Sequence, residues 1–201
     1  MQTKTHLALG HYLLGHEPDA GLHRRSEVFL LGNMEPDYNL ATYLRGLRGH
    51  GLFHGHNAAN SAAYVSGCLN SFEENGLRSG WSYFRLGALL HYAADAFTGP
   101  HNGFWTGGMV EHAVYEFKLH DVLTNELNTS GRCAAGDIGC ATLSEYFAAA
   151  HRRYCEDEKS AQTDSRYIIQ VCSALLHGIL SRGGCPAGPR RAKGKEEEHG
   201  R

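Results

Sequence analysis

The sequence has no excess of charge of one sign. Its 19 Lys and Arg residues nearly balance its 21 Asp and Glu residues, and the net charge is −2 with the histidines neutral. Proteins that bind nucleic acid through its phosphates usually carry a clearly basic patch. The charge balance therefore gives no sign of a large nucleic-acid interface.

Long hydrophobic runs are also missing. No stretch approaches the ~20 apolar residues of a transmembrane helix. The N-terminal segment has a single Lys, and His11, His16 and Glu17 interrupt the residues behind it, so it does not resemble a signal peptide. We therefore expect no transmembrane segment, no export and a cytoplasmic location.

None of the six cysteines is spaced as a CxxC motif, which removes the usual signal for a thiol-based zinc or redox site. Cys133 and Cys140 flank a Gly-containing turn and could pair in an oxidising compartment. We favour six reduced thiols and leave the pairing of these two open.

No run alternates with period two, and apolar residues recur mostly with helical spacing. This pattern predicts an all-α fold, with one compact multi-helix domain over residues 1–183. The Gly-, Pro- and charge-rich residues 184–201 cannot bury enough surface to fold, so we predict a disordered tail. We expect helices at about 4–16, 24–32, from Pro36, 57–75, 80–97, 107–128, 142–158 and 163–182.

Three kinds of residue mark the ends of these helices. Gly99-Pro100 is a strong breaker after the helix at 80–97. Pro36 suits the first turn of a helix. Asn57, Thr142 and Asp164 are residue types that cap helix N-termini.

Histidine, in contrast, is abundant, with 14 residues. His91 and Asp95 are four residues apart on one predicted helix, and His112 and Glu116 repeat this spacing on the next. Residues at i and i+4 project from one helix face. His101 lies in the connecting loop, so an antiparallel helix pair would bring all five side chains together. Nitrogen and carboxylate ligands in such a cluster suit zinc.

A single histidine on an apolar face is more often a core or surface residue than a ligand. Two His/acid pairs with a third histidine between them are harder to explain as core residues. Burying five titratable groups without a cation would cost several kcal/mol for each group that found no partner. We therefore predict that the set binds metal.

Several further segments accompany this cluster: Thr5-His6-Leu7, Gly32-Asn33 with Pro36-Asp37-Tyr38, Gly55-His56-Asn57, Pro100-His101-Asn102 and Leu119-His120. With them, residues 5–120 resemble the zinc-dependent phospholipase C family, which shares its fold with the P1-type nucleases. The resemblance implies a helical phospholipase C/P1 nuclease fold and two to three Zn²⁺ ions.

The resemblance also implies which residues bind each ion. A first zinc would be bound by Asp37, His56, His91 and Asp95, with His54 a weaker candidate than His56. A second would be bound by His101, His112 and Glu116, with open positions for water or substrate. A third, bridged by Asp95, would be bound by His6 and the free amino group of Met1. His120 matches the family pattern and would orient a ligand.

The implied reaction is hydrolysis of a phosphodiester by metal-activated water. Asp37 would orient or deprotonate the water in addition to binding the first zinc. Phe53, Phe104 and Trp105, together with Phe97, lie close in sequence to ligands and could receive the substrate. Phospholipid or a small phosphodiester is the expected substrate, and nucleic acid is possible.

Three functions remain open at this point. The first is a phospholipase C-like phosphodiester hydrolase, and the second is a nuclease or nucleotidase of the same fold. The third is a non-catalytic metal-binding protein that keeps the ligands. The complete ligand set favours an enzyme, and the near-neutral charge argues mildly against the nuclease.

Overall fold

The computed structural model describes residues 1–39, 58–129, 131 and 142–183. Within these residues it contains eight α-helices, one 3₁₀ helix and no strand, which confirms the predicted all-α fold. The α-helices are α1 (Thr3–His16), α2 (Ala20–His23), α3 (Ser26–Tyr38), α5 (Ala58–Asn75), α6 (Gly80–Asp95), α7 (Met109–Thr129), α8 (Leu143–Glu156) and α9 (Ala161–Gly183). The predicted tail and Asn57 lie outside the described residues.

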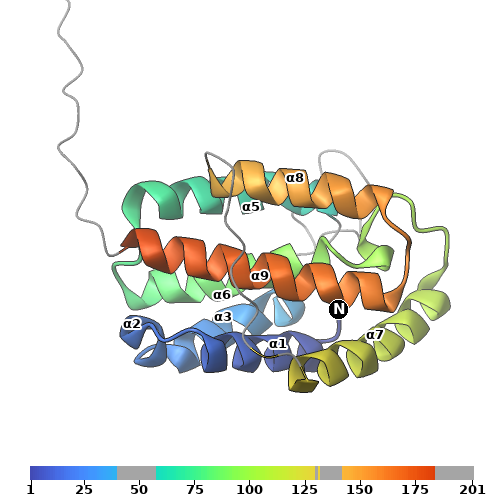
Figure 1. Cartoon of the computed structure of the whole chain (residues 1–201), viewed down its shortest axis with the longest axis horizontal. Coiled ribbons are helices and arrows are strands. Elements are labelled where there is room, and N and C mark those ends of the chain that lie inside the picture. Colours follow the sequence, from blue (N-terminus) through green and yellow to red (C-terminus); the bar gives the residue numbers. More distant parts are fainter. Residues whose placement is uncertain (40–57, 130, 132–141, 184–201) are drawn as a thin grey trace, which may run out of the picture.

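Helix α6 lies inside the bundle, and every residue from Leu86 to Asp95 is buried. It packs against α3, α5, α9 and α1, which together bury this stretch (Figure 1). The first part of this stretch, Leu86 to Leu90, is apolar all round, as expected for an internal helix. His91 and Asp95 are therefore held on the most enclosed helix of the molecule.

Helices α3 and α6 cross at very close range through two glycines. A Cβ atom added at Gly32 would lie 2.0 Å from the Phe84 carbonyl oxygen, and one added at Gly87 would lie 2.0 Å from the Phe29 carbonyl oxygen. Both neighbours are backbone atoms, which cannot move aside as a side chain can. Only glycine fits at these positions, and the crossing brings Asp37 at the end of α3 beside α6.

Two predictions about helix ends were wrong. The chain does not form separate helices before and after residue 36, because α3 runs continuously from Ser26 to Tyr38 with Pro36 inside it. Proline removes one backbone donor and crowds the carbonyl of the residue four positions earlier. Here that residue is Gly32, and α3 ends two residues after Pro36, so only one hydrogen bond is lost.

The second error concerns the cap of α9, which begins at Ala161, close to the predicted start at about 163. The Ser160 hydroxyl accepts a hydrogen bond from the Thr163 amide at 3.1 Å, as a capping residue does. Asp164 therefore lies inside the first turn and does not cap it. The Thr142 cap is confirmed, because its hydroxyl accepts from the Glu145 amide and Glu145 bonds back to the Thr142 amide.

Three described cysteines, Cys68, Cys155 and Cys172, are free thiols, and only Cys155 is exposed. Cys133 and Cys140 lie outside the described residues, so their pairing stays a prediction.

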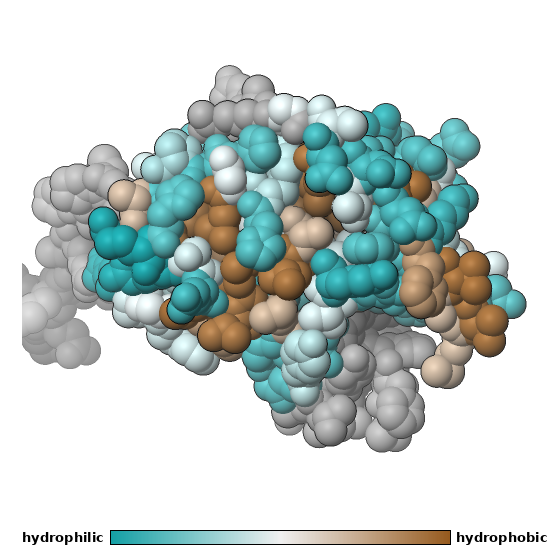
Figure 2. Space-filling model, turned by 90° about the horizontal axis from the view of Figure 1, so that it is seen from below, coloured by the Kyte–Doolittle hydropathy of each residue, from teal (hydrophilic) through white to brown (hydrophobic). Residues whose placement is uncertain are grey.

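The face seen in Figure 2 combines polar areas, drawn in teal, with apolar areas, drawn in brown. Helix α7 leaves the apolar side chains of Met109, Val110, Val114 and Phe117 exposed. Among the described helices, none combines the length and the apolar character that crossing a membrane requires.

Candidate metal centre

The predicted convergence of two helices and their connection is found. Helix α6 carries His91 and Asp95, the 3₁₀ turn η1 (Gly99–His101) follows it, and α7 carries His112 and Glu116. His101 Nδ1 lies 3.3 Å from Asp95 Oδ1, and His112 Nε2 lies 3.0 Å from Glu116 Oε1. His101 Nε2 is 3.9 Å from the same Glu116 oxygen, so the turn connects the two helices.

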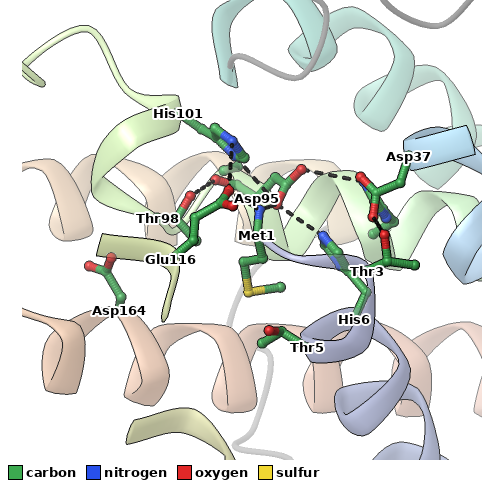
Figure 3. Close-up of polar contacts among 12 residues, drawn as sticks. Met1, Thr3, Thr5, His6, Asp37, Asp95, Thr98, His101, Glu116 and Asp164 are labelled. Atoms are coloured by element: carbon green, nitrogen blue, oxygen red, sulfur yellow. Dashed lines mark hydrogen bonds and ion pairs between the residues drawn. The ribbon is translucent and has the colours of Figure 1, made fainter. Parts of the chain in front are cut away.

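The Asp95 carboxylate lies at the centre of the cluster (Figure 3). Its Oδ1 atom is 3.2 Å from His6 Nε2 and 3.3 Å from His101 Nδ1, and its Oδ2 atom is 3.4 Å from His91 Nε2. Burial raises the pKa of this carboxyl, but His101, the Met1 amine and the other imidazoles outweigh it and hold the pKa well below the usual value. Asp95 is therefore ionised at neutral pH.

The ligand atoms form two groups, each with all its atoms within 4.8 Å of one another. The first, called here the buried group, consists of His6, His91 and Asp95. The rings of His6 and His91 stack with centroids 3.6 Å apart. Burial, together with the neighbouring His91, lowers the pKa of His6 to about 4. His6 is therefore neutral at neutral pH, as a metal ligand must be.

The second, called here the open group, consists of His101, His112 and Glu116. The side chain of His112 is 35% exposed, whereas His6 is fully buried. The His112 hydrogen bond, the Met1 amine and the His101 ring outweigh the effect of burial and lower the pKa of Glu116 to about 2. Glu116 is thus an ionised oxygen ligand at the edge of the cluster, where solvent can reach it.

The donor atoms of both groups fit zinc, which binds imidazole nitrogen and carboxylate oxygen. His6 Nδ1 is buried without a hydrogen-bond partner among the described residues. His91 Nδ1 lies 2.8 Å from the Asn33 carbonyl oxygen and must donate its proton to it, which leaves Nε2 as the free donor for a metal. This backbone contact depends on the close crossing of α3 and α6.

Asp37 reaches the cluster from the end of α3. Its Oδ1 atom lies 3.6 Å from His91 Nε2. The Thr3 hydroxyl at the start of α1 donates a hydrogen bond to its Oδ2 atom at 2.7 Å (Figure 3). Asp37 therefore lies beside the buried group with one oxygen held and the other directed at His91.

The Met1 amino group also lies in the cluster. Its nitrogen is 2.6 Å from Asp95 Oδ1 and 3.3 Å from Glu116 Oε1. Burial lowers the pKa of this amine, but the carboxylates of Asp95 and Glu116 outweigh that effect and raise the pKa. The amine thus occupies the space between the two groups, where a cation would be attracted by the same carboxylates.

Other predicted site residues divide into three cases. His54, His56 and Phe53 lie outside the described residues. Phe97 is completely buried among aromatic rings and cannot line an entrance. Phe104 is 37% exposed, and Trp105 packs edge-on against Tyr115.

His120 bonds to a residue beside a ligand. Its Nδ1 atom is 2.9 Å from the Thr5 hydroxyl, so it holds the residue next to His6.

Several contacts around the cluster have no counterpart in the sequence prediction. The Asn33 carbonyl and the Thr3 hydroxyl were not assigned roles, because a backbone acceptor and a common hydroxyl carry no recognisable spacing. Asp164 was interpreted as a helix cap, yet its carboxylate accepts hydrogen bonds from the Gly99 amide and from the hydroxyls of Tyr115 and Tyr154. Burial raises the pKa of this carboxyl, and these hydrogen bonds oppose the shift.

Comparison with protein families matches residues 5–181 to the family described as zinc dependent phospholipase C. The match covers most of the chain and includes all the described ligand residues except Met1. Neither the comparison with curated proteins nor that with solved structures gave a match.

Proposed function

Since the chain belongs to the zinc-dependent phospholipase C family, we propose that it is a zinc-dependent hydrolase of phosphodiester bonds with a phospholipase C-like substrate. One observation carries the proposal. A single ionised carboxylate, Asp95, lies within about one hydrogen-bond length of imidazoles from α1, α6 and η1. Imidazole nitrogens gathered around an ionised carboxylate are the donor set that zinc binds.

We assign His91 and Asp95 of the buried group, together with Asp37, to bind one zinc, with His56 as the remaining ligand. His101, His112 and Glu116 bind a second, and Asp95 bridges toward a third ion that His6 and the Met1 amine would hold. The open group has three protein ligands and a partly exposed edge. Three protein ligands with an open position are typical of catalytic zinc, whereas structural zinc sites are closed.

Bound zinc would polarise a phosphoryl oxygen as a Lewis acid and lower the pKa of water toward ~7. Asp37 is the residue that we expect to orient the attacking water and accept its proton. Thr3 holds one Asp37 oxygen at 2.7 Å, so the other oxygen keeps a fixed direction toward the cluster. A general base needs such a fixed position within reach of the proton that it removes.

Phe104 and Trp105 follow His101 closely and are the described aromatic residues that we expect to contact the organic part of the substrate. Phe104 is partly exposed and lies with its ring 4.7 Å from the Lys159 ammonium group. A cation beside an aromatic ring suits a molecule that carries both a phosphate and an apolar part. A nucleic acid also offers phosphate and stacking bases, so the preference for a phospholipid or small phosphodiester rests on the near-neutral net charge of −2.

The test uses the full chain. Zinc per chain is measured first, followed by hydrolysis of a chromogenic phosphocholine ester, phosphatidylcholine micelles and single-stranded DNA, each with and without chelator. His112→Ala removes a ligand of the open group, and His177→Ala is the matched control because His177 pairs with Glu17 away from the cluster.

We expect chelator and His112→Ala to abolish hydrolysis of the phosphocholine ester, while His177→Ala keeps wild-type activity. Faster hydrolysis of DNA than of the phosphocholine substrates would contradict the phospholipase C-like function and support the nuclease. Zinc binding without hydrolysis of any of the three substrates would support the non-catalytic alternative.

A further inference from the structure

Asp164 is a buried carboxylate that the proposed reaction does not use. It lies in the first turn of α9 and is 1% exposed. Its Oδ2 atom accepts a hydrogen bond from the Gly99 amide at 2.9 Å and from the Tyr115 hydroxyl at 2.7 Å. Its Oδ1 atom accepts from the Tyr154 hydroxyl at 2.9 Å. In the part of the chain that the structure describes, no cationic side chain forms an ion pair with it.

Two of these three donors belong to the segments that carry the open group. Gly99 begins η1, and His101 ends it. Tyr115 directly precedes Glu116 on α7 and is one turn from His112. The Oδ2 atom of Asp164 therefore joins the two segments whose relative position determines the distances between the ligand atoms. Tyr154, the third donor, lies on α8, which carries no ligand.

The turn that carries His101 has a second anchor on its other side. The Asn102 amide group donates to the carbonyl oxygens of Ala96 and Thr98 at 2.9 and 2.8 Å. Its Oδ1 atom lies 2.9 Å from His151 Nε2 on α8 and must accept a hydrogen bond from it. Asn102 thus holds the turn together and against α8, while Asp164 ties the first residue of the turn to Tyr115 on α7.

The two ligand groups differ in how much they need this connection. The buried group is built on the enclosed helix α6, where packing holds the side chains on all sides. The open group draws one ligand from a short turn and two from a helix whose facing surface is partly exposed. A buried carboxylate side chain that accepts hydrogen bonds from both segments supplies the rigidity that packing does not supply there.

We propose that Asp164 is a positioning residue for the open group, which sets the spacing of His101 and Glu116 through the Gly99 amide and the Tyr115 hydroxyl. This rests on the proposed function in one respect, namely that the open group binds zinc. The proposal predicts a loss of zinc affinity that is confined to one of the two groups. A residue that only stabilised the fold would weaken both groups together.

The test compares two tyrosines that donate to the same carboxylate. Tyr115→Phe removes the hydroxyl on the ligand-bearing helix, and Tyr154→Phe removes the hydroxyl on α8. Metal-free full-length protein is titrated with zinc against a chromophoric chelator, and His112→Ala identifies the binding step of the open group. Circular dichroism melting of the metal-free variants reports their stability.

We expect Tyr115→Phe to weaken zinc binding at the open group about 10-fold, as is typical for partners that orient metal ligands. Tyr154→Phe should lower the melting temperature about as much as Tyr115→Phe does. It should keep the zinc affinity of the open group within about twofold of wild type. Asp164→Ala should weaken the same step by up to ~100-fold. Asp164→Asn, which can still accept from Gly99 and Tyr115, should restore most of the affinity.

Equal loss of affinity in Tyr115→Phe and Tyr154→Phe would overturn the positioning role, as would failure of Asp164→Asn to restore binding in a folded protein. If Asp164→Ala does not fold, the tyrosine pair decides the outcome. If His112→Ala binds as much zinc as wild type, the open group is not a metal site and the proposed function fails. If the Asp164 and Tyr115 variants bind zinc with wild-type affinity while His112→Ala does not, the proposed metal centre is supported and only the role of Asp164 is refuted.

Discussion

The buried group and the open group use the same residue types in different surroundings. His6, His91 and Asp95 are at most 1% exposed and lie on or against the enclosed helix α6. His112 and Glu116 are 35% and 20% exposed on α7. The buried group is therefore held by packing, whereas the open group depends on a few hydrogen bonds. We infer that the first half binds metal rigidly and that the second half admits substrate.

Asp95→Asn is the change that should affect both groups most strongly. It removes the charge that His6, His91 and His101 share, so zinc should be lost from both groups together. Because even partners that only orient a ligand cost 10–100-fold, the loss of this ligand should reduce activity by more than ~100-fold. Zinc per chain and phosphocholine ester hydrolysis check this, with Asp121→Asn on the surface of α7 as the control. Unchanged zinc content would exclude the bridging role.

Acid should destabilise the metal-free protein through the buried group. The pKa of His6 is about 4 in the folded protein, whereas the pKa of a histidine in the unfolded chain is 6.5. As pH falls from 6.5 to 4, the unfolded chain binds a proton at His6 that the folded chain does not bind. The free energy of unfolding therefore falls, by up to ~3 kcal/mol for a shift of this size.

Urea unfolding of metal-free wild type and His6→Asn between pH 7 and pH 4 measures this effect. The variant should lose less stability over that window. Asp95 contributes in a different window, because its lowered pKa adds stability that is lost only at more acidic pH. Identical pH dependence in the two proteins would contradict the pKa shift of His6.

Gly87→Ala tests whether the buried group depends on the crossing of α3 and α6. The new methyl group would meet the Phe29 carbonyl at 2.0 Å, so we expect a loss of about 1–3 kcal/mol in stability. Zinc binding at the buried group should weaken, because the Asn33 carbonyl that orients His91 moves with α3. Thermal melting and zinc titration check both effects.

Gly67→Ala on α5 is the matched control for that change. An added Cβ atom there has no neighbour within 4 Å, so the same substitution should stabilise the helix by ~0.5–1 kcal/mol. Equal effects of the two substitutions would show that the close crossing is not required.

Thr3→Val should have the smallest effect on activity, and this effect should be limited to the side of the cluster where Asp37 lies beside the buried group. It removes the hydrogen bond that holds one oxygen of Asp37. We expect kcat to fall about 10-fold or less, with the zinc content unchanged. Thr129→Val, at the exposed end of α7, is the control for the substitution. A fall in zinc content without a change in kcat would assign Asp37 to metal binding alone.

Much of this cluster could be predicted because its ligands follow local rules. His91 with Asp95, and His112 with Glu116, lie on one helix face by their spacing alone, and α6 ends at Asp95, two residues before the predicted end and shortly before Gly99-Pro100. The errors arose where local signals and tertiary contacts disagree. Pro36 is a helix starter by type but lies inside α3, and Asp164 is a cap by type but bonds to residues 49 and 65 positions away.

Periodicity and i, i+4 spacing depend only on helix geometry, so they determined the helical fold class and the two His/acid pairs with His101 between them. His6, Asp37 and the Met1 amine were implied only by the family resemblance. The tertiary structure alone decided that the ligands divide into a buried and an open group. It also decided that Asn33, Thr3 and Asp164 hold them in place. The reason is physical: burial and hydrogen bonding to a distant segment arise when helices pack, and no spacing along the chain records which backbone carbonyl or hydroxyl will lie opposite a given ring.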